Sequence, residues 1–316
     1  MREEHSKIQR LVDIARAYYE DNRTQQEIAR RFGISRPLVS RLLTEAREAG
    51  IVTIRINEPW ETNIRLRNQL VETFGLNGAT PVPEGGNINV TNEAMAEAVI
   101  TLIKMFHNKR FGVGWGTMVG VLAQLMDSRP PMQGIARSFC PLIGNGGFPN
   151  RNYHSNEIVR IFAQSTASQP VYWHSPAFAE SETEAQHIRE LENSRALREH
   201  WRKLEVAIVN IGNYPSVPDL ATRAQFQDLL IRRRAVGRLL SYYFDIDGDV
   251  IHPETDLTMQ IPLDILRRCP AVIGVCAANA TPETITGALR SGCISHIIVP
   301  VELATRALAI ARKSAG

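Results

Sequence analysis

The sequence has few cysteines, and none of them has the spacing of a metal or redox motif. Cys140, Cys269, Cys276 and Cys293 form no CxxC pair. Structural zinc sites need Cys or His pairs a few residues apart, and secreted domains use paired cysteines as a disulfide framework. We therefore expect reduced, partly buried thiols, no bound metal and a cytoplasmic protein.

Long apolar runs are also missing. No stretch of about 18 apolar residues occurs, so we expect no transmembrane helix and no membrane partner. The first ten residues, MREEHSKIQR, lack the apolar core of a signal peptide. Hydrophobic residues make up 44% of the 316, the usual share for a globular protein, and this length suffices for one small and one large domain.

Excess positive charge is absent from most of the chain and is confined to its first fifth. Residues 1–57 hold 11 Lys and Arg against 8 Asp and Glu, and the rest of the 36 basic and 33 acidic residues balance at 25 each. Arg30, Arg31, Arg36 and Arg41 follow one another without an intervening acid. Such a block is typical of a surface that faces phosphates, although alone it also fits a solvated face.

The basic segment predicts three helices. Apolar residues at three- and four-residue intervals indicate the first over residues 8–19. Thr24 and Glu27 form a capping box that starts the second, Gly33 allows a sharp turn, and Ser35 caps the third.

A short strand like that of a wing is expected over residues 51–56, where apolar and polar residues alternate. Asn57-Glu58-Pro59 then ends the pattern. We expect a DNA-binding domain over 1–57 and a second domain over 58–316.

The third helix separates an apolar face from a basic one. Its core-facing residues are Val39, Leu42, Leu43 and Ala46, and the other side carries Arg36, Pro37, Ser40, Arg41, Thr44 and Arg47. Since a helix fits the major groove and Arg pairs with guanine, this face is predicted to read DNA, with Thr24, Gln25 and Gln26 at the phosphate backbone. The alternative is a packing module with incidental arginines, and a recombinase or sigma-like factor could also carry such a unit.

Beyond Pro59 the chain alternates helices with short apolar strands. Helices are predicted over 62–74, 92–107 and 117–126, and strands over 111–115, 138–143, 171–173, 206–211, 271–275 and 294–299. This alternation indicates an α/β domain, a mostly parallel, doubly wound sheet with helices on both faces. Helix 62–74 either pairs with a second subunit or packs on its own domain.

A hairpin is predicted in the C-terminal third. Residues 242–245 and 250–251 flank the turn pair Asp247-Gly248. The aspartates here superficially resemble a calcium loop, but the glycine is misplaced and no Glu closes the loop, so a turn is the simpler interpretation.

Two glycine-containing loops lie at predicted carboxyl ends of strands, where open parallel sheets bind ligands. The first, Gly114-Trp115-Gly116-Thr117, leads into a helix and is expected to present free N–H groups and a hydroxyl to an anion. The second is Gly144-Asn145-Gly146-Gly147. Neither has the GxGxxG or P-loop spacing, so no nucleotide cofactor is expected, and either loop could be only a tight turn.

Taken together, the chain resembles the SorC family of bacterial sugar-responsive regulators. The resemblance rests on TQQEIARRFGISRPLVSRLLTEAREAGIVTIRI, FGVGWGTMVGVL, PLIGNGG, VAIVNIG, RRAVGRLLSYYFDIDGDV and the final IGVCAANATPETITGALRSGCISHIIVP, in family order over nearly the full length. It implies a winged-helix-like domain joined to a domain similar to sugar-phosphate isomerases and CoA transferases. It also implies dimers or tetramers, and a phosphorylated sugar effector whose binding changes affinity for a double-stranded DNA operator.

The sequence departs from the family pattern where an effector is expected. Thr117-Met118 replaces Thr-Thr, Arg238 replaces a carboxylate, and the Gly-Gly-x-x-Lys stretch becomes residues 277–281 without its lysine. Val301 replaces an acid. Either the pocket takes a more anionic or differently oriented ligand, or the response to sugar phosphates has drifted or been lost.

The resemblance assigns the effector to Gly114, Gly116, Thr117, Met118, Gly144, Asn145, Gly146, Arg238, Ala278 and Asn279. We therefore interpret the chain as a ligand-responsive, homo-oligomeric transcription regulator and not as an enzyme. The rival is a sugar-phosphate isomerase or CoA transferase with an appended DNA-binding unit. It is disfavoured because residues 238, 281 and 301 supply no acid or lysine.

Overall fold

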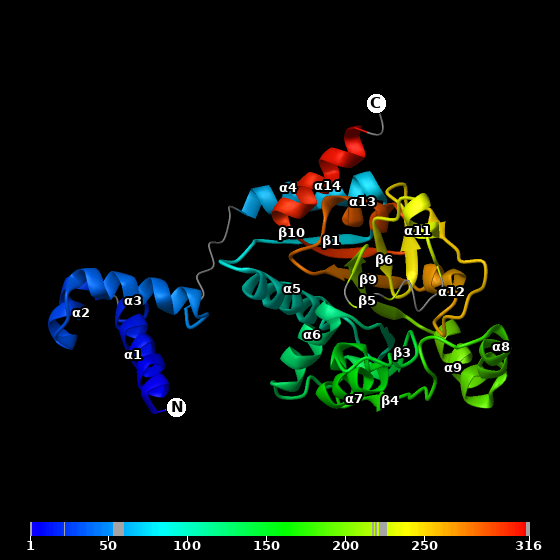
Figure 1. The fold of residues 1–316 in the computed structure, drawn as a ribbon, viewed down its shortest axis with the longest axis horizontal. Helices are drawn as coiled ribbons and strands as arrows, with labels where there is room; N and C mark the ends of the chain where they lie inside the picture. The colour runs from blue at the N-terminus through cyan, green and yellow to red at the C-terminus, as the bar shows by residue number, and fades with distance from the viewer. Residues whose placement is uncertain are drawn as a thin grey trace. The chain divides into compact units, whose positions relative to one another are not determined.

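The computed structural model describes residues 2–21, 23–52, 60–216, 218, 220 and 226–313. The chain divides into two compact units, Met1–Ile56 with Gly85–Val90, and Asn57–Glu84 with Thr91–Gly316 (Figure 1). The boundary predicted at 57–59, and all of the predicted wing strand beyond Val52, lie outside the described residues.

The small unit contains three helices, as the sequence predicts: α1 (Arg2–Tyr19), α2 (Gln25–Phe32) and α3 (Arg36–Glu48). Its core is built from apolar residues spaced three or four apart on each helix. The buried members are Leu11, Ile14, Ala15, Ala17, Ile28, Ala29, Val39, Leu43 and Ala46. Burial of one stripe of each helix leaves the opposite side of α3 open to solvent.

The large unit is built around one sheet. Its strands are β1 (Gly78–Val82), β2 (Lys109–Val113), β3 (Ala136–Pro141), β4 (Gln169–Pro170), β5 (Val206–Asn213), β6 (Gly237–Leu239), β7 (Tyr242–Phe244), β8 (Val250–Ile251), β9 (Ala271–Cys276) and β10 (His296–Pro300). The order is β1-β10-β9-β5-β2-β3-β4, all parallel, and β6, β7 and β8 continue antiparallel from β5. The mostly parallel α/β prediction is confirmed.

Helices cover both faces of this sheet. They are α4 (Trp60–Phe74), α5 (Ile88–Ile103), α6 (Thr117–Asp127), α7 (Ser155–Ser165), α8 (Glu182–Glu190), α9 (Glu192–Arg202), α11 (Leu229–Arg232), α12 (Leu263–Arg268), α13 (Pro282–Arg290) and α14 (Val301–Lys313), with a 3₁₀ turn at Arg151–Tyr153. Figure 1 shows α4, α13 and α14 on one face and α5, α6 and α7 on the other. Helix α4 packs on β1 and α14 of its own chain and buries Leu66 and Leu70 there, whereas Ile64 stays exposed.

The central strands are buried on both faces. Every residue of β9 is buried, and so are the first six of β5, because helices cover them from either side. Phe111 of β2 stacks on Phe139 of β3 with ring centroids 4.9 Å apart. This core fixes the carboxyl ends of β2, β3, β5 and β9 along one edge of the sheet.

Several predicted boundaries are wrong. The strand predicted over 171–173 is not formed, since β4 occupies Gln169–Pro170. The helix predicted over 92–107 runs from Ile88 to Ile103, and β1 and β6 were not predicted. The hairpin is confirmed, because Tyr243 pairs with Ile251 and Phe244 with Val250. The Asp245 carboxylate accepts the N–H groups of Asp247 and Asp249, both at 3.0 Å, so this segment is a turn.

Candidate nucleic-acid interface and ligand-binding loops

The start of α2 is fixed by local hydrogen bonds. Thr24 Oγ1 accepts the Glu27 N–H at 3.3 Å, and Glu27 Oε2 accepts the Thr24 N–H at 2.8 Å, which completes the predicted capping box. The backbone hydrogen bond from Thr24 lowers the pKa of Glu27. Gly33 adopts a left-handed conformation with φ of 64°, where a side chain would be strained. These bonds set the turn between α2 and α3.

Helix α3 presents a polar face of the predicted composition. Ser35 caps it by accepting the Leu38 N–H at 3.4 Å, and Pro37 lies in its first turn. Its polar side carries Arg36, Pro37, Ser40, Arg41, Thr44 and Arg47, all of which are exposed. This face therefore offers guanidinium and hydroxyl groups to a partner.

The side chains at the two ends of this face differ in how far hydrogen bonds within α3 hold them. Thr44 Oγ1 donates to the Ser40 carbonyl at 3.2 Å and accepts a hydrogen bond from Arg47 Nη2 at 3.2 Å. Within the described part of the chain, Arg36 and Arg41 have no intramolecular ion pair. The C-terminal end is thus held against the helix, and the N-terminal arginines are available to an external anion.

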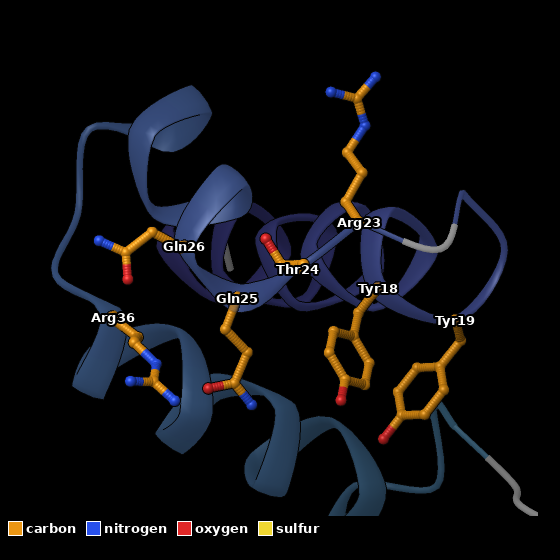
Figure 2. A pocket seen from close by; sticks show the side chains of 7 residues that line it. All are labelled: Tyr18, Tyr19, Arg23, Thr24, Gln25, Gln26 and Arg36. Atoms are coloured by element: carbon orange, nitrogen blue, oxygen red, sulfur yellow. The ribbon is translucent and has the colours of Figure 1, made fainter.

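A hollow of about 630 Å³ adjoins the start of α3. Four of the predicted DNA-contacting or flanking residues line it, namely Thr24, Gln25, Gln26 and Arg36, together with Tyr18, Tyr19 and Arg23. Figure 2 shows the two tyrosine rings side by side near Gln25, and Arg23 pointing away from them; the tyrosine ring centroids lie 4.9 Å apart.

Sequence reasoning placed Tyr18 and Tyr19 in the apolar stripe of α1 and did not assign them to this surface. Both are only half-buried. Both rings pack against the core of the small unit and still expose an edge to the hollow. The sequence predicts their burial but gives no signal for this surface position.

The loop after β2 is tied to its neighbours by its backbone. Gly114 N–H donates to the Ile208 carbonyl, Gly116 N–H to the Asn152 carbonyl and Met118 N–H to Asn210 Oδ1, each at 2.9 Å. The prediction that the loop Gly114–Thr117 presents free N–H groups is wrong for Gly114 and Gly116. Two of these acceptors lie on β5 and the third on the 3₁₀ turn Arg151–Tyr153. Thr117 is the exposed residue of the loop.

The loop after β3 is tied in the same way. The N–H groups of Gly144, Asn145 and Gly146 donate to the carbonyls of Met259, Ser175 and Tyr153, each at 2.8 Å. Asn145 also donates from Nδ2 to the Trp173 carbonyl and accepts the Asn156 N–H. A β-carbon at Gly146 would lie 2.9 Å from the Trp115 ring, so the structure brings the two loops together through that indole.

Three further predicted effector residues lie on β6 and after β9. Ala278 N–H donates to Asn92 Oδ1 at 2.8 Å, and the exposed Asn279 accepts a hydrogen bond from Asn213 Nδ2 on its carbonyl at 3.1 Å. Arg238 pairs with Gly212 of β5 and is only 3% exposed.

The guanidinium of Arg238 is incompletely satisfied. Its Nη1 donates to the Leu240 carbonyl at 2.8 Å, whereas its buried Nε has no hydrogen-bond partner. Among the described residues no carboxylate pairs with it. Trp115 Nε1, at the same edge of the sheet, is also buried without a partner. Two donors at the carboxyl edge are therefore left for an external acceptor.

Asn210 and Asn213 of β5 were missed by sequence reasoning. Asn210 is 6% exposed and accepts the Met118 N–H, and Asn213 Oδ1 accepts the Thr281 N–H at 3.2 Å. The signal lay in the strand itself, since VAIVNIGN places amides in an otherwise apolar run. A polar side chain in a central strand needs a partner, and here the partners are the ligand-facing loops.

In the described part of the chain, no cluster of three His, Cys, Asp or Glu side chains could hold a metal ion. None of the helices described there has both the length and the apolar character to cross a membrane.

Comparison with known families assigns both units. Residues 58–309 match the family described as "Putative sugar-binding domain", and residues 15–59 match the MarR family. The second match covers the helix-turn-helix, in agreement with its prediction.

Relatives are similar over nearly the whole chain. The sorbitol operon regulator of Klebsiella pneumoniae is 29% identical over 94% of this chain and 96% of its own length. The deoxyribonucleoside regulator of Bacillus subtilis (strain 168) is 28% identical over 96% and 98%. The crystal structure of full-length SorC from Klebsiella pneumoniae aligns with a TM-score of 0.70 at 27% identity, and the alignment covers 96% of this chain and 99% of that one.

Proposed function

Because this chain belongs to the SorC family of transcriptional regulators, we propose that α3 reads an operator and that a small anionic sugar derivative, bound by the large unit, changes operator affinity. The protein is a DNA-binding transcriptional regulator with a sugar-binding domain, and not an enzyme. The proposal adds the residues that do this, the charge of the effector, a homo-oligomer and a cytoplasmic location.

At the DNA, the exposed N-terminal part of α3 carries base recognition. Arg36, Ser40 and Arg41 contact base edges in the major groove, since their side chains are exposed and the two guanidiniums are unpaired. Thr24, Gln25, Gln26, Pro37, Thr44 and Arg47 position the unit on phosphates. Arg47 suits this role because Thr44 already holds its guanidinium close to the helix.

In the large unit, the observation that carries the proposal is the buried, unpaired charge of Arg238. Burying a guanidinium without a counter-charge costs desolvation free energy. A bound anion would offset this cost, which the protein without ligand bears. Thr117, at the start of α6, adds an exposed hydroxyl. The other predicted residues, Gly114, Gly116, Met118, Gly144, Asn145, Gly146, Ala278 and Asn279, shape the edge through their backbones.

The effector assignment is tested by thermal unfolding in the presence of sugar phosphates and sugar acids, with the corresponding neutral sugars as controls. We expect at least one anionic sugar to raise the Tm of the wild-type protein, because a ligand that binds only the folded state stabilises it. Arg238→Met should abolish that rise. The exposed Arg233→Met is the matched control and should retain it.

Without ligand, Arg238→Met should be at least as stable as wild type. Its free energy of unfolding should rise by up to about 4 kcal/mol, because a buried charge is removed. An equal ligand-induced rise in Arg238→Met and wild type would contradict the role of Arg238. It would leave the DNA-binding assignment untouched.

A further inference from the structure

A second hollow lies in the large unit, and Arg238 is not among the residues that line it. It has a volume of about 360 Å³ and is bounded by α9, the segment after β4 and residues 256–263. Trp173 and Trp201 line it together with Arg189, Arg198, Tyr242 and His252. This volume lies in the range of small-molecule sites, about 300–1,000 Å³. The hollow belongs to none of the loops discussed above.

Its aromatic groups are held in place by hydrogen bonds. Trp173 Nε1 donates to Ser194 Oγ at 3.0 Å, and Trp201 Nε1 donates to the Pro141 carbonyl at 2.8 Å. The two indole rings meet edge to face with centroids 5.4 Å apart. Tyr242 donates its hydroxyl to the Ile261 carbonyl at 2.7 Å. A ligand would meet rigid aromatic groups whose polar ends are already satisfied.

The charge of the hollow is positive. Arg198 Nε is buried without a hydrogen-bond partner, and no carboxylate among the described residues pairs with Arg198. On the same helix Arg202 is paired with Glu199, and Arg195 is exposed to water, so Arg198 differs from both by its buried, unpartnered Nε. Arg189 donates to the Asp256 carbonyl at 2.6 Å and contributes a second positive charge. Asp256 supplies one carboxylate, which leaves one charge uncompensated.

We propose that this hollow is a binding site for a small anion in which a carboxylate or phosphate ester is attached to a flat, largely apolar ring. Arg198 binds the anionic group, and the ring packs among Trp173, Trp201 and Tyr242. Guanidinium groups recognise carboxylate and phosphate in the same planar geometry, so both anions belong to one chemical class. The site goes beyond the proposed function and does not depend on it.

The site shares a wall with the loop after β3. Met259 lines the hollow, and its carbonyl accepts the Gly144 N–H at 2.8 Å. Trp173 also lines it, and its carbonyl accepts a hydrogen bond from Asn145 Nδ2 at 3.2 Å. A ligand that restrains Met259 and Trp173 therefore also restrains Gly144 and Asn145, which are hydrogen-bonded to their carbonyls.

Calorimetric titration of the full chain tests the site, with benzoate and phenyl phosphate as the two anionic probes and benzamide as the neutral one. We expect millimolar or tighter binding of at least one anion, and at least tenfold weaker binding of benzamide. Arg198→Met should weaken the anion at least tenfold. Arg195→Met, an exposed arginine on the same helix outside the hollow, should leave it unchanged.

If Arg198→Met does not fold, Arg198→Lys keeps the charge and loses the planar fork, and should bind several-fold more weakly than wild type. Absence of saturable binding by both anions, or equal binding by wild type and an Arg198 variant, overturns the proposal. The shared wall has its own readout. Bound probe should slow amide hydrogen exchange at Gly144, and an unchanged rate overturns the link to that loop.

Discussion

Arg238 and Arg41 differ in burial, and this difference is the basis of the two roles proposed for them. Arg41 is exposed on α3 and loses little by standing unpaired in water. Arg238 is nearly excluded from solvent, so its unpaired charge is a cost that only a counter-ion relieves. In the sequence each of them is followed by a pair of leucines, so the local pattern does not distinguish them. Only the position of each in its unit separates the proposed DNA contact from the proposed effector contact.

Arg41→Ala should weaken operator binding by roughly 1–3 kcal/mol and relax preference at one base pair, because a bidentate contact to a guanine edge is lost. Arg47→Ala is the comparison, since its expected partner is a phosphate: binding should weaken for all sequences alike, and the salt slope should fall by about 1. Binding titrations against the operator and single-base variants, at several salt concentrations, measure both. A uniform loss across sequences in Arg41→Ala would make it a phosphate contact.

At the scale of elements, the capped helices of the small unit were predictable and the ends of several large-unit elements were not. Thr24, Glu27, Gly33 and Ser35 specify both ends of α2 and the start of α3 by contacts at most four residues apart. The start of α5 has a local cap that sequence reasoning missed, since Asn87 Oδ1 accepts the Val90 N–H at 3.0 Å, whereas the place of β4 carries no such short-range signal. Pro170 of β4 pairs with Phe139 of β3, a partner that no short-range pattern reveals.

The capping box should make the stability of α2 depend on pH. The pKa of Glu27 lies below its ordinary value of 4.5 in the folded protein, so its carboxylate stabilises the helix above the unfolded-state pKa. This contribution is lost as the pH falls through the folded-state value. Glu27→Gln should therefore speed amide exchange at Glu27 and Ile28 near neutral pH and change it little in acid below that value.

Glu48→Gln is the matched control for this pH dependence. Glu48 is exposed at the end of α3 and takes no part in a capping box, so the Glu48→Gln substitution removes the same charge without breaking a cap. Its variant should exchange like wild type at both pH values. If the exchange rates of Glu27→Gln and wild type differ by the same factor at neutral and acid pH, the charge of Glu27 does not stabilise the capping box and the prediction is wrong.

At the scale of the molecule, the order of the strands was the part that sequence reasoning left unspecified. β1 pairs with β10, and β5 lies between β9 and β2, so partners are separated by most of the unit. Alternation of helices and strands indicates parallel pairing but not which strands become neighbours. The same gap hid the role of Asn210, because its partner Met118 lies 92 residues earlier.

Two DNA-binding units in one homo-oligomer should bind an operator with two half-sites far more tightly than a single half-site. The second contact becomes intramolecular, which strengthens binding by about 10² or more when both half-sites are reachable at once. If the effector acts by changing how the two DNA-binding units of the homo-oligomer are arranged, it should alter affinity for the two-half-site operator several-fold. Affinity for one half-site should hardly change.

Titrations of both DNAs with and without the anionic sugar selected by thermal unfolding measure this difference. Arg238→Met should keep the advantage of the second half-site and lose the response to the sugar. An equal change on both DNAs would place the effect within a single DNA-binding unit. A change in how two such units are arranged would affect only the DNA that carries the second half-site.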